Sequence, residues 1–409
     1  MTNTEPRPFS INVDQEILDW VTDRVRTSRI IPDAVQLPEN KLWADGTPSS
    51  VMRDLVEYWK NDYDWRKVEA KLNSRYKMFM IDIEEAGEDI QLHFVHHRSD
   101  RKDAIPLLFP HGWPGNFTEV GDLLSLTAPE DPKQQAFHIV APTIPGYVFS
   151  SPPKSPDFNI TNIGEVYHKL MVQLGYPKYV GQGGDWGSMI LRSMAQKRPE
   201  SLVAVHLNLV FAGVPSIWHP FVLMKLILRM FTEDEKKRLG RMQNYLTHEI
   251  GYATIQKTKP QSLSYGLLDS PVGMLAWIRE KLNNWSEPDY VWDKEVVITW
   301  TMLYLLSNSA WHARLYKSSL PDLHPQLILN QSIPSTVAFG ASLFPAEIAY
   351  VPRWWAQGSV ADNIVFWKEK QKGGHFASVE VPDALKKDLL EFVNLLPKAT
   401  KVSLREQVN

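Results

Sequence analysis

The first part of the chain has a helical spacing of apolar residues. Between residues 12 and 75, apolar side chains recur in stripes, beginning with Ile17, Leu18, Val21 and Val25, and this spacing places them on one face of a helix. Asn12 and Thr47-Pro48 stand ahead of two such stripes and predict two helix N-termini. The region has an apolar face but no core of its own, so we expect an N-terminal arm that packs on the rest of the protein.

From Tyr76 onward, short apolar runs alternate with helical patterns. The runs 78–83 and 91–97 flank a charged turn that contains Gly87, and they predict a hairpin. Continuous apolar runs, which are typical of buried parallel strands, cover 105–109, 137–141 and 202–207, and helical patterns cover about 162–174 and 189–197. We therefore expect an α/β fold with a mostly parallel central sheet that is flanked by helices.

The alternation stops near Phe211 and resumes near Ser335. The patterns between these points are mostly helical and cover 221–230, 233–245, 273–282 and 296–307. A helical insertion between two stretches of one sheet predicts a lid, because such folds bind ligands at the carboxyl ends of their strands. The last strands, 336–339 and 363–367, and a closing helix at 384–396 complete the pattern. We divide the chain into the arm with the first hairpin strand at 1–90, the core at 91–211 and 334–409, and the lid at 212–333.

One apolar segment of the predicted lid, Ile217 to Phe231, raises the alternative of docking to a membrane surface. Lys225 and Arg229 interrupt this segment, so we favour a lid helix that covers an apolar pocket. Nothing in the chain approaches the roughly 18 consecutive apolar residues of a membrane span. The N-terminal residues also lack the pattern of a secretory signal. We therefore expect a soluble cytoplasmic protein.

Composition narrows the possible functions. The chain has 409 residues, which is enough for one large domain with an insertion. Its formal net charge is −3 without a long basic block, so nucleic-acid binding has no electrostatic support. The absence of cysteine excludes disulfides and cysteine nucleophiles. His93, His96 and His97 have no carboxylate or thiolate beside them, so we expect no metal site and no cofactor. A homodimer is compatible with these features.

The turn Gly183-Gly184-Asp185-Trp186-Gly187-Ser188 carries the most chemical information. A strand, a turn crowded with small residues and a helix form the elbow that exposes a catalytic nucleophile. The residue at the tip is Asp185 instead of the usual serine. A carboxylate is already anionic at neutral pH, and its attack on a saturated carbon leaves an ester that water can cleave. The elbow thus favours displacement followed by ester hydrolysis, with a helix capped by Asp185 as the structural alternative.

An enzyme of this kind needs a base that activates water and an acid that orients the base. His375 lies in the glycine-rich sequence Gly373-Gly374-His375-Phe376 after the last predicted strand, and we interpret it as the base. Glu347 follows the preceding strand and is our candidate for the orienting acid, with Asp362 as its rival. The other position where this architecture can place the acid holds Asn208, whose side chain cannot serve as one.

The sequence His111-Gly112-Trp113-Pro114-Gly115 follows a buried run, and we interpret it as part of an oxyanion hole. The tetrahedral intermediate of ester hydrolysis needs two N–H donors, and the backbones of Trp113 and Trp186 are the candidates. We predict a cis peptide bond between Trp113 and Pro114, because such bonds recur in tight turns.

These three motifs, the N-terminal helical region and the sequence Thr258-Lys-Pro-Gln-Ser…Leu268-Asp-Ser-Pro-Val-Gly resemble the epoxide hydrolases of the microsomal, juvenile-hormone and soluble fungal branch. The resemblance covers nearly the whole chain. It implies an α/β-hydrolase fold and the conversion of a hydrophobic epoxide to a vicinal diol through an ester on the nucleophile. It also implies two lid tyrosines that hold and protonate the epoxide oxygen, and these match Tyr252 and Tyr316. Many relatives have Asp where this chain has Glu347.

Two other functions stay open at this point. A haloalkane dehalogenase also carries Gly-x-Asp-Trp-Gly, but it usually places a halide-binding Asn after His-Gly, where this chain has Trp113. A hydrolase fold without activity could act as a receptor for a hydrophobic ligand. The intact set of Asp185, Glu347 and His375 argues against such a receptor.

Overall fold

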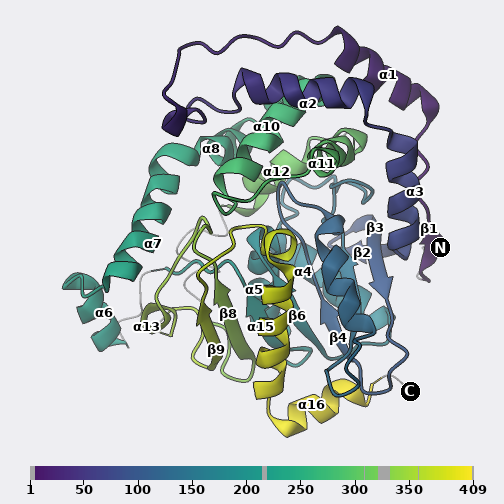
Figure 1. Ribbon diagram of the computed structural model, residues 1–409. Coiled ribbons are helices and arrows are strands. Elements are labelled where there is room, and N and C mark those ends of the chain that lie inside the picture. Colours follow the sequence, from purple (N-terminus) through teal and green to yellow (C-terminus); the bar gives the residue numbers. More distant parts are fainter. Residues whose placement is uncertain (1–4, 214–218, 308, 321–331, 358, 408–409) are drawn as a thin grey trace.

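The computed structural model describes residues 5–213, 219–307, 309–320, 332–357 and 359–407. The strands form one sheet in the order β1-β2-β3-β5-β4-β6-β7-β8-β9 (Figure 1). They are β1(Arg7–Phe9), β2(Met78–Glu85), β3(Glu88–His97), β4(Ile105–Leu108), β5(Phe137–Pro142), β6(Tyr179–Gly183), β7(Leu202–Leu207), β8(Ala338–Leu343) and β9(Ile364–Glu369). Along this order, neighbouring strands from β1 to β5 pair antiparallel, and neighbouring strands from β5 through β4 to β9 pair parallel. This arrangement confirms the predicted mostly parallel sheet.

The helices fall into three groups. The N-terminal arm contains α1(Gln15–Thr27), the 3-10 helix η1(Glu39–Lys41), α2(Ser49–Asn61) and α3(Trp65–Arg75). The sheet is accompanied by the 3-10 helix η2(Phe117–Thr127), α4(Ile160–Gln173), α5(Asp185–Lys197), α13(Arg353–Ala356), α14(Ala377–Glu380), α15(Pro382–Leu395) and α16(Lys398–Arg405). The insertion between β7 and β8 contains α6(Pro220–Ile227), α7(Glu233–Asn244), the π-helix η3(Tyr245–Glu249), α8(Gly251–Thr258), α9(Pro260–Asp269), α10(Pro271–Asn284), α11(Lys294–Leu306) and α12(Trp311–Ser319).

The helical insertion is thus present, whereas the boundaries of the four-part division stay a prediction. Residues 214–218, 308 and 321–331 of the predicted lid lie outside the described residues. Every residue of β4, β5, β6 and β8 is buried. This burial explains their continuous apolar sequences, because the central strands of a parallel sheet are covered on both faces. Figure 1 shows α15 in front of the sheet.

The N-terminal arm lies over the lid, with α1 and α2 above α10 in Figure 1. The hydroxyl of Thr47 donates a hydrogen bond of 2.8 Å to the carbonyl oxygen of Ala276 in α10. Ion pairs Arg24–Asp269 and Lys294–Asp54, at 2.8 and 2.6 Å, join the arm to the lid as well. The predicted apolar face of α2 is buried through Met52, Leu55, Val56 and Trp59. The arm therefore has no separate core and is part of the lid's outer layer.

Both predicted helix N-termini in the arm are wrong. Helix α1 begins after Asp14 instead of Asn12, and α2 begins after Pro48 instead of Thr47. The first turn of α2 is capped from a distance, because the carboxylate of Asp33 accepts hydrogen bonds from the backbone N–H and the hydroxyl of Ser49, at 2.7 and 2.8 Å. A cap from a residue 16 positions away leaves no local capping pattern in the sequence.

Helix α6 also differs from the prediction. None of its residues is buried, and Phe221, Met224 and Ile227 are exposed, so much of its apolar surface is not turned toward a pocket. Residues 217 and 218 of the predicted segment lie outside the described residues.

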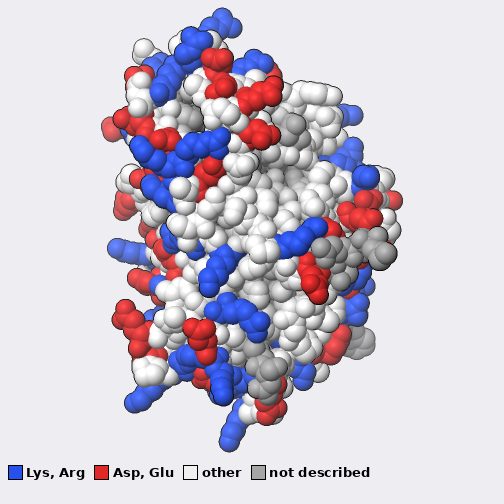
Figure 2. Space-filling model, turned by 90° about the vertical axis from the view of Figure 1, so that its right-hand side faces the viewer, with Lys and Arg blue, Asp and Glu red and all other residues white. Residues whose placement is uncertain are grey.

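Charged side chains of both signs are distributed over the surface. On the face shown in Figure 2, Lys and Arg alternate with Asp and Glu around an uncharged central area, without a continuous basic stripe. Within the described part of the chain, no helix combines the length and the apolar character that crossing a membrane requires.

Candidate active site

Asp185 stands at the junction of β6 and α5, so the predicted strand, turn and helix are present. Its backbone φ is 45°, in the left-handed region that residues other than glycine rarely adopt. Strained conformations of this kind concentrate at functional sites, where the surrounding structure holds them in place. The local geometry is therefore that of an elbow that presents a side chain, and Asp185 is more than a helix cap.

Two glycines allow the elbow to approach the loop that follows β4. A Cβ atom on Gly112 would lie 2.2 Å from Oδ1 of Asp185, and a Cβ atom on Gly187 would lie 2.1 Å from the carbonyl oxygen of Pro110. Larger residues therefore do not fit at either position. This approach lets the N–H of Trp113 donate a hydrogen bond of 2.7 Å to Oδ1 of Asp185. The predicted cis bond between Trp113 and Pro114 is confirmed.

His375 lies in the loop after β9 and joins two carboxylates. Its Nδ1 is 2.6 Å from Oε1 of Glu347, and its Nε2 is 3.3 Å from Oδ2 of Asp185. A bridge between Ala346 and Gly374 holds the two loops side by side. The rival acid, Asp362, is exposed at the surface. The structure thus brings together Asp185, His375 and Glu347 in one chain of hydrogen-bonding groups, with His375 and Glu347 buried and Asp185 half-buried.

The two carboxylates set the protonation of His375. Burial by itself lowers the pKa of an imidazole, but the charges of Glu347 and Asp185 more than offset this effect and raise the pKa of His375 well above its ordinary value. Glu347 is fixed in turn, because its Oε1 also accepts a hydrogen bond of 2.6 Å from the N–H of Ile348. The two carboxylates therefore favour the protonated imidazole in the free protein.

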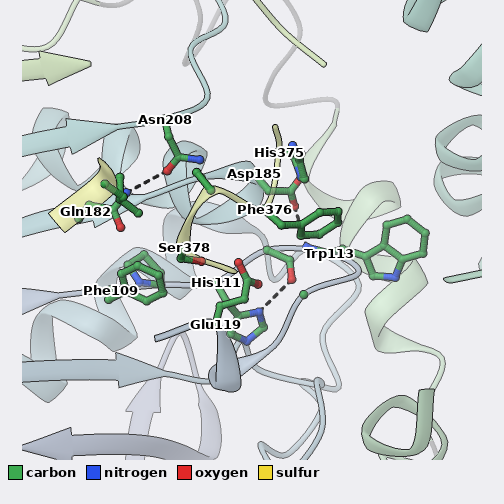
Figure 3. A pocket seen from close by; sticks show the side chains of 16 residues that line it. Phe109, His111, Trp113, Glu119, Gln182, Asp185, Asn208, His375, Phe376 and Ser378 are labelled. Carbon is green, nitrogen blue, oxygen red and sulfur yellow. Dashed lines mark hydrogen bonds and ion pairs between the residues drawn. The ribbon is translucent and has the colours of Figure 1, made fainter. Parts of the chain in front are cut away.

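A small cavity beside Asp185 and His375 is also lined by Glu119 (Figure 3). Its volume of about 20 Å³ suits a single water molecule, since a buried water needs at least about 10–15 Å³. Burial is the main reason that the pKa of Glu119 is raised to about 8; His375 opposes the shift, and the charge of Asp185 adds a smaller upward contribution. The carboxyl group of Glu119 is therefore mostly protonated at neutral pH and can donate a hydrogen bond into this cavity.

Glu119 is a residue of the site that the sequence patterns did not indicate. Its spacing from Asn116 is that of a capping box, and this pattern indicates only a helix start. Asn116 does cap η2, because its side chain accepts a hydrogen bond of 3.0 Å from the N–H of Thr118. Glu119 stands four residues after Gly115 of the predicted oxyanion-hole sequence, and this closeness is the one signal in the sequence that could have indicated it.

Two amide side chains line the same small cavity, and a second cavity lies next to it. Nε2 of Gln182 donates a hydrogen bond of 2.9 Å to Oδ1 of Asn208, and both residues line the small cavity. A larger cavity of about 350 Å³ lies among residues of α3, η2 and α11. Glu119 and Ser378 line both cavities, so Glu119 stands between the site and a space nearer the surface.

The two predicted tyrosines come from α8 and α12 and lie together. The rings of Tyr252 and Tyr316 are 5.7 Å apart between centroids. Trp113 stacks on Tyr252 at 5.1 Å, and Trp186 meets Tyr316 edge to face at 4.9 Å. The hydroxyl of Tyr245, which sequence analysis placed only at a helix end, is 2.9 Å from the hydroxyl of Tyr252. Both predicted tyrosines thus contact the tryptophans of the proposed oxyanion hole.

Tyr252 and Tyr316 are not among the residues that line the small cavity, so this cavity does not lie between Asp185 and the two phenols. Burial raises the pKa of Tyr316 well above its ordinary value, and the charge of Asp185 is the next cause. The pKa of Tyr252 is raised in the same direction by burial and by the neighbouring phenols. Both phenols therefore keep their protons at neutral pH and can act as donors.

Comparisons with known proteins agree with this site. Residues 6–120 match the family described as "Epoxide hydrolase N terminus", and residues 105–226 match "alpha/beta hydrolase fold". Epoxide hydrolase 1 of Sus scrofa is 31% identical over 418 residues, which cover 95% of this chain and 89% of the relative. The structure of the Aspergillus niger epoxide hydrolase has a TM-score of 0.81 and 32% identity, with 96% of this chain and 97% of that chain covered.

The juvenile hormone epoxide hydrolase of the silkworm Bombyx mori is also similar, with a TM-score of 0.84, 28% identity and coverage of 96% and 95% of the two chains. These similarities extend over nearly the whole chain and confirm the predicted α/β-hydrolase fold. They do not favour a haloalkane dehalogenase or a receptor. The elbow with its aspartate, the arm and the lid all agree with one conclusion: this chain belongs to the epoxide hydrolases, which convert an epoxide and water to a diol.

Proposed function

We propose that Asp185 opens the epoxide by direct attack. Oδ2 of Asp185 forms a bond to one epoxide carbon, the bond from that carbon to the ring oxygen breaks, and the oxygen takes a proton from Tyr252 or Tyr316. The product is an ester on Asp185, with a hydroxyl group on the neighbouring carbon. A strained ring still has a poor leaving group, so a phenol proton at the oxygen lowers the barrier.

The second step hydrolyses this ester. His375 takes a proton from water, and the resulting hydroxide attacks the carboxyl carbon of Asp185. The N–H groups of Trp113 and Trp186 hold the negative oxygen of the tetrahedral intermediate. The bond from that carbon to the diol oxygen then breaks, His375 returns its proton to the diol, and the proton left on the carboxyl group of Asp185 returns to the phenolate. Glu347 holds the imidazole in orientation throughout.

One observation carries the proposal: the two oxygens of Asp185 have different partners. Oδ1 accepts the 2.7 Å hydrogen bond from Trp113, and Oδ2 faces the imidazole of His375 at 3.3 Å. The hydrogen bond from the N–H of Trp113 supports Oδ1 as the oxygen that stays on the enzyme through both steps. The small cavity beside His375 has room for one water molecule, which supports attack by water from that side. We propose that Glu119 holds this water.

The aromatic surroundings of Tyr252 and Tyr316 favour a hydrophobic epoxide over a polar one. The cytoplasmic location and the homodimer stay predictions, which cell fractionation and sedimentation velocity would test.

A single turnover in water labelled with ¹⁸O tests the covalent route. With enzyme in excess over styrene oxide, the label should enter the carboxylate of Asp185 and be missing from the diol, as peptide mass spectrometry would detect. Direct appearance of the label in the diol would falsify the ester intermediate. Asp185→Asn is the matched control, because it keeps the shape of the side chain and should form neither ester nor diol.

A further inference from the structure

Helix α6 exposes its apolar side. The exposed fractions of Phe221, Met224, Ile227 and Leu228 are 76, 46, 69 and 62%, and Met230, after the helix, is 54% exposed. Positions 221, 224, 227 and 228 lie on one face of a helix, so these side chains form a continuous stripe, which we call the α6 stripe. Single exposed apolar residues are common, whereas a contiguous exposed patch marks an interaction site.

The orientation of α6 is fixed from its inner side. The ammonium group of Lys225 lies 5.6 Å from the ring centroid of Trp354 in α13, and the ring of Phe231 lies 5.6 Å from the same tryptophan. The indole N–H of Trp355 donates a hydrogen bond of 2.9 Å to the carbonyl oxygen of Gly213, ahead of the helix. These contacts hold the two ends of α6 and Lys225 against α13, and Val222, Leu223 and Leu226 on the opposite side of the helix are half-buried, so Phe221, Met224 and Ile227 are left pointing outward.

The segment that carries the stripe is positively charged. Residues 219–231 contain Lys225 and Arg229 and no acidic residue, and Arg229 forms no ion pair with any described residue. The acidic residues that follow are engaged locally. Glu233 pairs with Lys236 at 2.7 Å and Asp234 pairs with Arg238 at 2.8 Å. Glu235 accepts a hydrogen bond of 2.9 Å from the indole N–H of Trp354.

We propose that the α6 stripe docks on the surface of a membrane that contains anionic lipids. Apolar side chains on one face with cations beside them are the composition of helices that lie in the interface of a bilayer, and cations near the surface are attracted by anionic headgroups. Figure 1 shows α6 at the outer end of α7, at the periphery of the molecule, where a flat surface can reach it. The helix inserts its apolar face only to the boundary of headgroups and acyl chains and does not span the bilayer.

A second copy of the chain fits this stripe less well. A standard interface between proteins uses about 20–30 residues on each side, whereas the stripe and Met230 are five side chains. A bilayer needs no complementary shape, so a short apolar face with flanking cations suits it better.

Flotation with vesicles tests the proposal. The full chain is mixed with vesicles of phosphatidylcholine alone or with added phosphatidylglycerol, and the bound fraction is measured. We expect binding to the anionic vesicles that weakens with rising salt. The double variant Phe221→Glu, Ile227→Glu should bind at least about tenfold more weakly, because two large apolar side chains no longer leave water. Arg229→Gln should lower binding to anionic vesicles by roughly fivefold.

The matched control is Ile31→Glu with Val291→Glu, which replaces apolar residues that are 78 and 87% exposed but lie outside the stripe. This control should bind vesicles as the wild type does. Turnover of styrene oxide, a soluble substrate, should be equal in all these variants and checks that each is folded. Binding to neither kind of vesicle, or equal binding by the α6 variant, overturns the proposal. A wild-type dimer that becomes a monomer in the α6 variant, in sedimentation velocity without lipid, assigns the stripe to a second copy and overturns it as well.

Discussion

At the scale of single residues, the charge of Asp185 controls the proton of His375. In the free protein the protonated imidazole is favoured, because Glu347 and Asp185 both stabilise its charge and raise its pKa. A cation cannot accept a proton from water. Esterification of Asp185 removes one of the two negative charges, so the pKa of His375 falls, the ring releases its proton to solvent, and it can then act as a base. The first chemical step therefore prepares the group that the second step needs.

This coupling predicts different pH dependences for the two steps. Ester formation in single-turnover experiments should proceed while His375 is protonated, including at neutral pH. Ester hydrolysis should require the neutral ring, with an apparent pKa lower than that of the free enzyme. Rapid quenching followed by mass spectrometry of the Asp185 peptide measures both rates. Equal pKa values for the two steps would contradict the coupling.

The variant His375→Gln separates the steps further. It keeps a polar side chain beside Asp185 but has no base, so the ester should form and persist, with hydrolysis slowed by about 10²–10⁴-fold. Glu347→Gln is the comparison, because it loses the orienting charge but keeps the imidazole, and it should slow hydrolysis less. Absence of an accumulated ester in His375→Gln would argue for direct attack of water on the epoxide.

Glu119 is predicted to act in its protonated form. Because its pKa is about 8, the carboxyl group is mostly neutral at pH 7 and ionises as the pH rises through about 8. Glu119→Gln, which also donates hydrogen bonds, should keep most of the hydrolysis rate, whereas Glu119→Ala should lose more. The pH profile of kcat in the wild type should change near pH 8, and the profile of Glu119→Gln should lack this change. Identical profiles would exclude the assigned role.

At the scale of elements, local patterns predict what local interactions determine. The pattern at 296–307 predicts α11, which spans Lys294–Leu306, because an apolar run of this length is too long for a typical strand and fits a buried helix. The motifs likewise indicate Asp185 and His375, since an elbow and a glycine-rich loop are local. The order of the strands already favours Glu347 over Asp362, but the contact between Glu347 and His375 depends on the bridge between two loops, and the cap of α2 comes from Asp33. Such contacts join distant segments, so the sequence pattern does not contain them.

The loop after β4 lies so close to Asp185 that one added methyl group would not fit between them. Gly112→Ala places a Cβ atom within 2.3 Å of two atoms of Asp185, so the nucleophile must move. Because misplacement by about 1 Å can cost about 10²-fold in rate, we expect kcat to fall by at least that factor. Gly240→Ala in α7 is the control, since nothing lies within 4 Å of its Cβ atom, and alanine there should stabilise the protein by about 0.5–1 kcal/mol. Equal activity of the two variants would show that the loop adapts.

At the scale of the whole molecule, the lid is fastened both to the core beside the site and to the arm. The hydroxyl of Tyr304 in α11 donates a hydrogen bond of 2.7 Å to the carbonyl oxygen of Gly115, at the end of the oxyanion-hole loop. The indole N–H of Trp300 donates one of 3.1 Å to the hydroxyl of Thr118. On its other side, the same helix meets the arm, where the hydroxyls of Tyr63 and Thr299 lie 3.2 Å apart. Helix α11 thus connects the arm to the loop that holds Trp113.

The hydrogen bonds of Tyr304 and Tyr63 allow the roles of lid and arm to be separated. Tyr304→Phe leaves the buried carbonyl of Gly115 without this donor, so it should destabilise the protein by about 1–3 kcal/mol and, because Gly115 is two residues from Trp113, lower kcat as well. Tyr63→Phe removes a hydrogen bond of the same type at the arm and should reduce stability by about 0.5–1.5 kcal/mol without changing kcat. Urea unfolding and turnover of styrene oxide measure the two effects. If both variants lose stability but keep kcat, α11 fastens the lid without positioning the oxyanion hole, and the loop after β4 is held by the core alone.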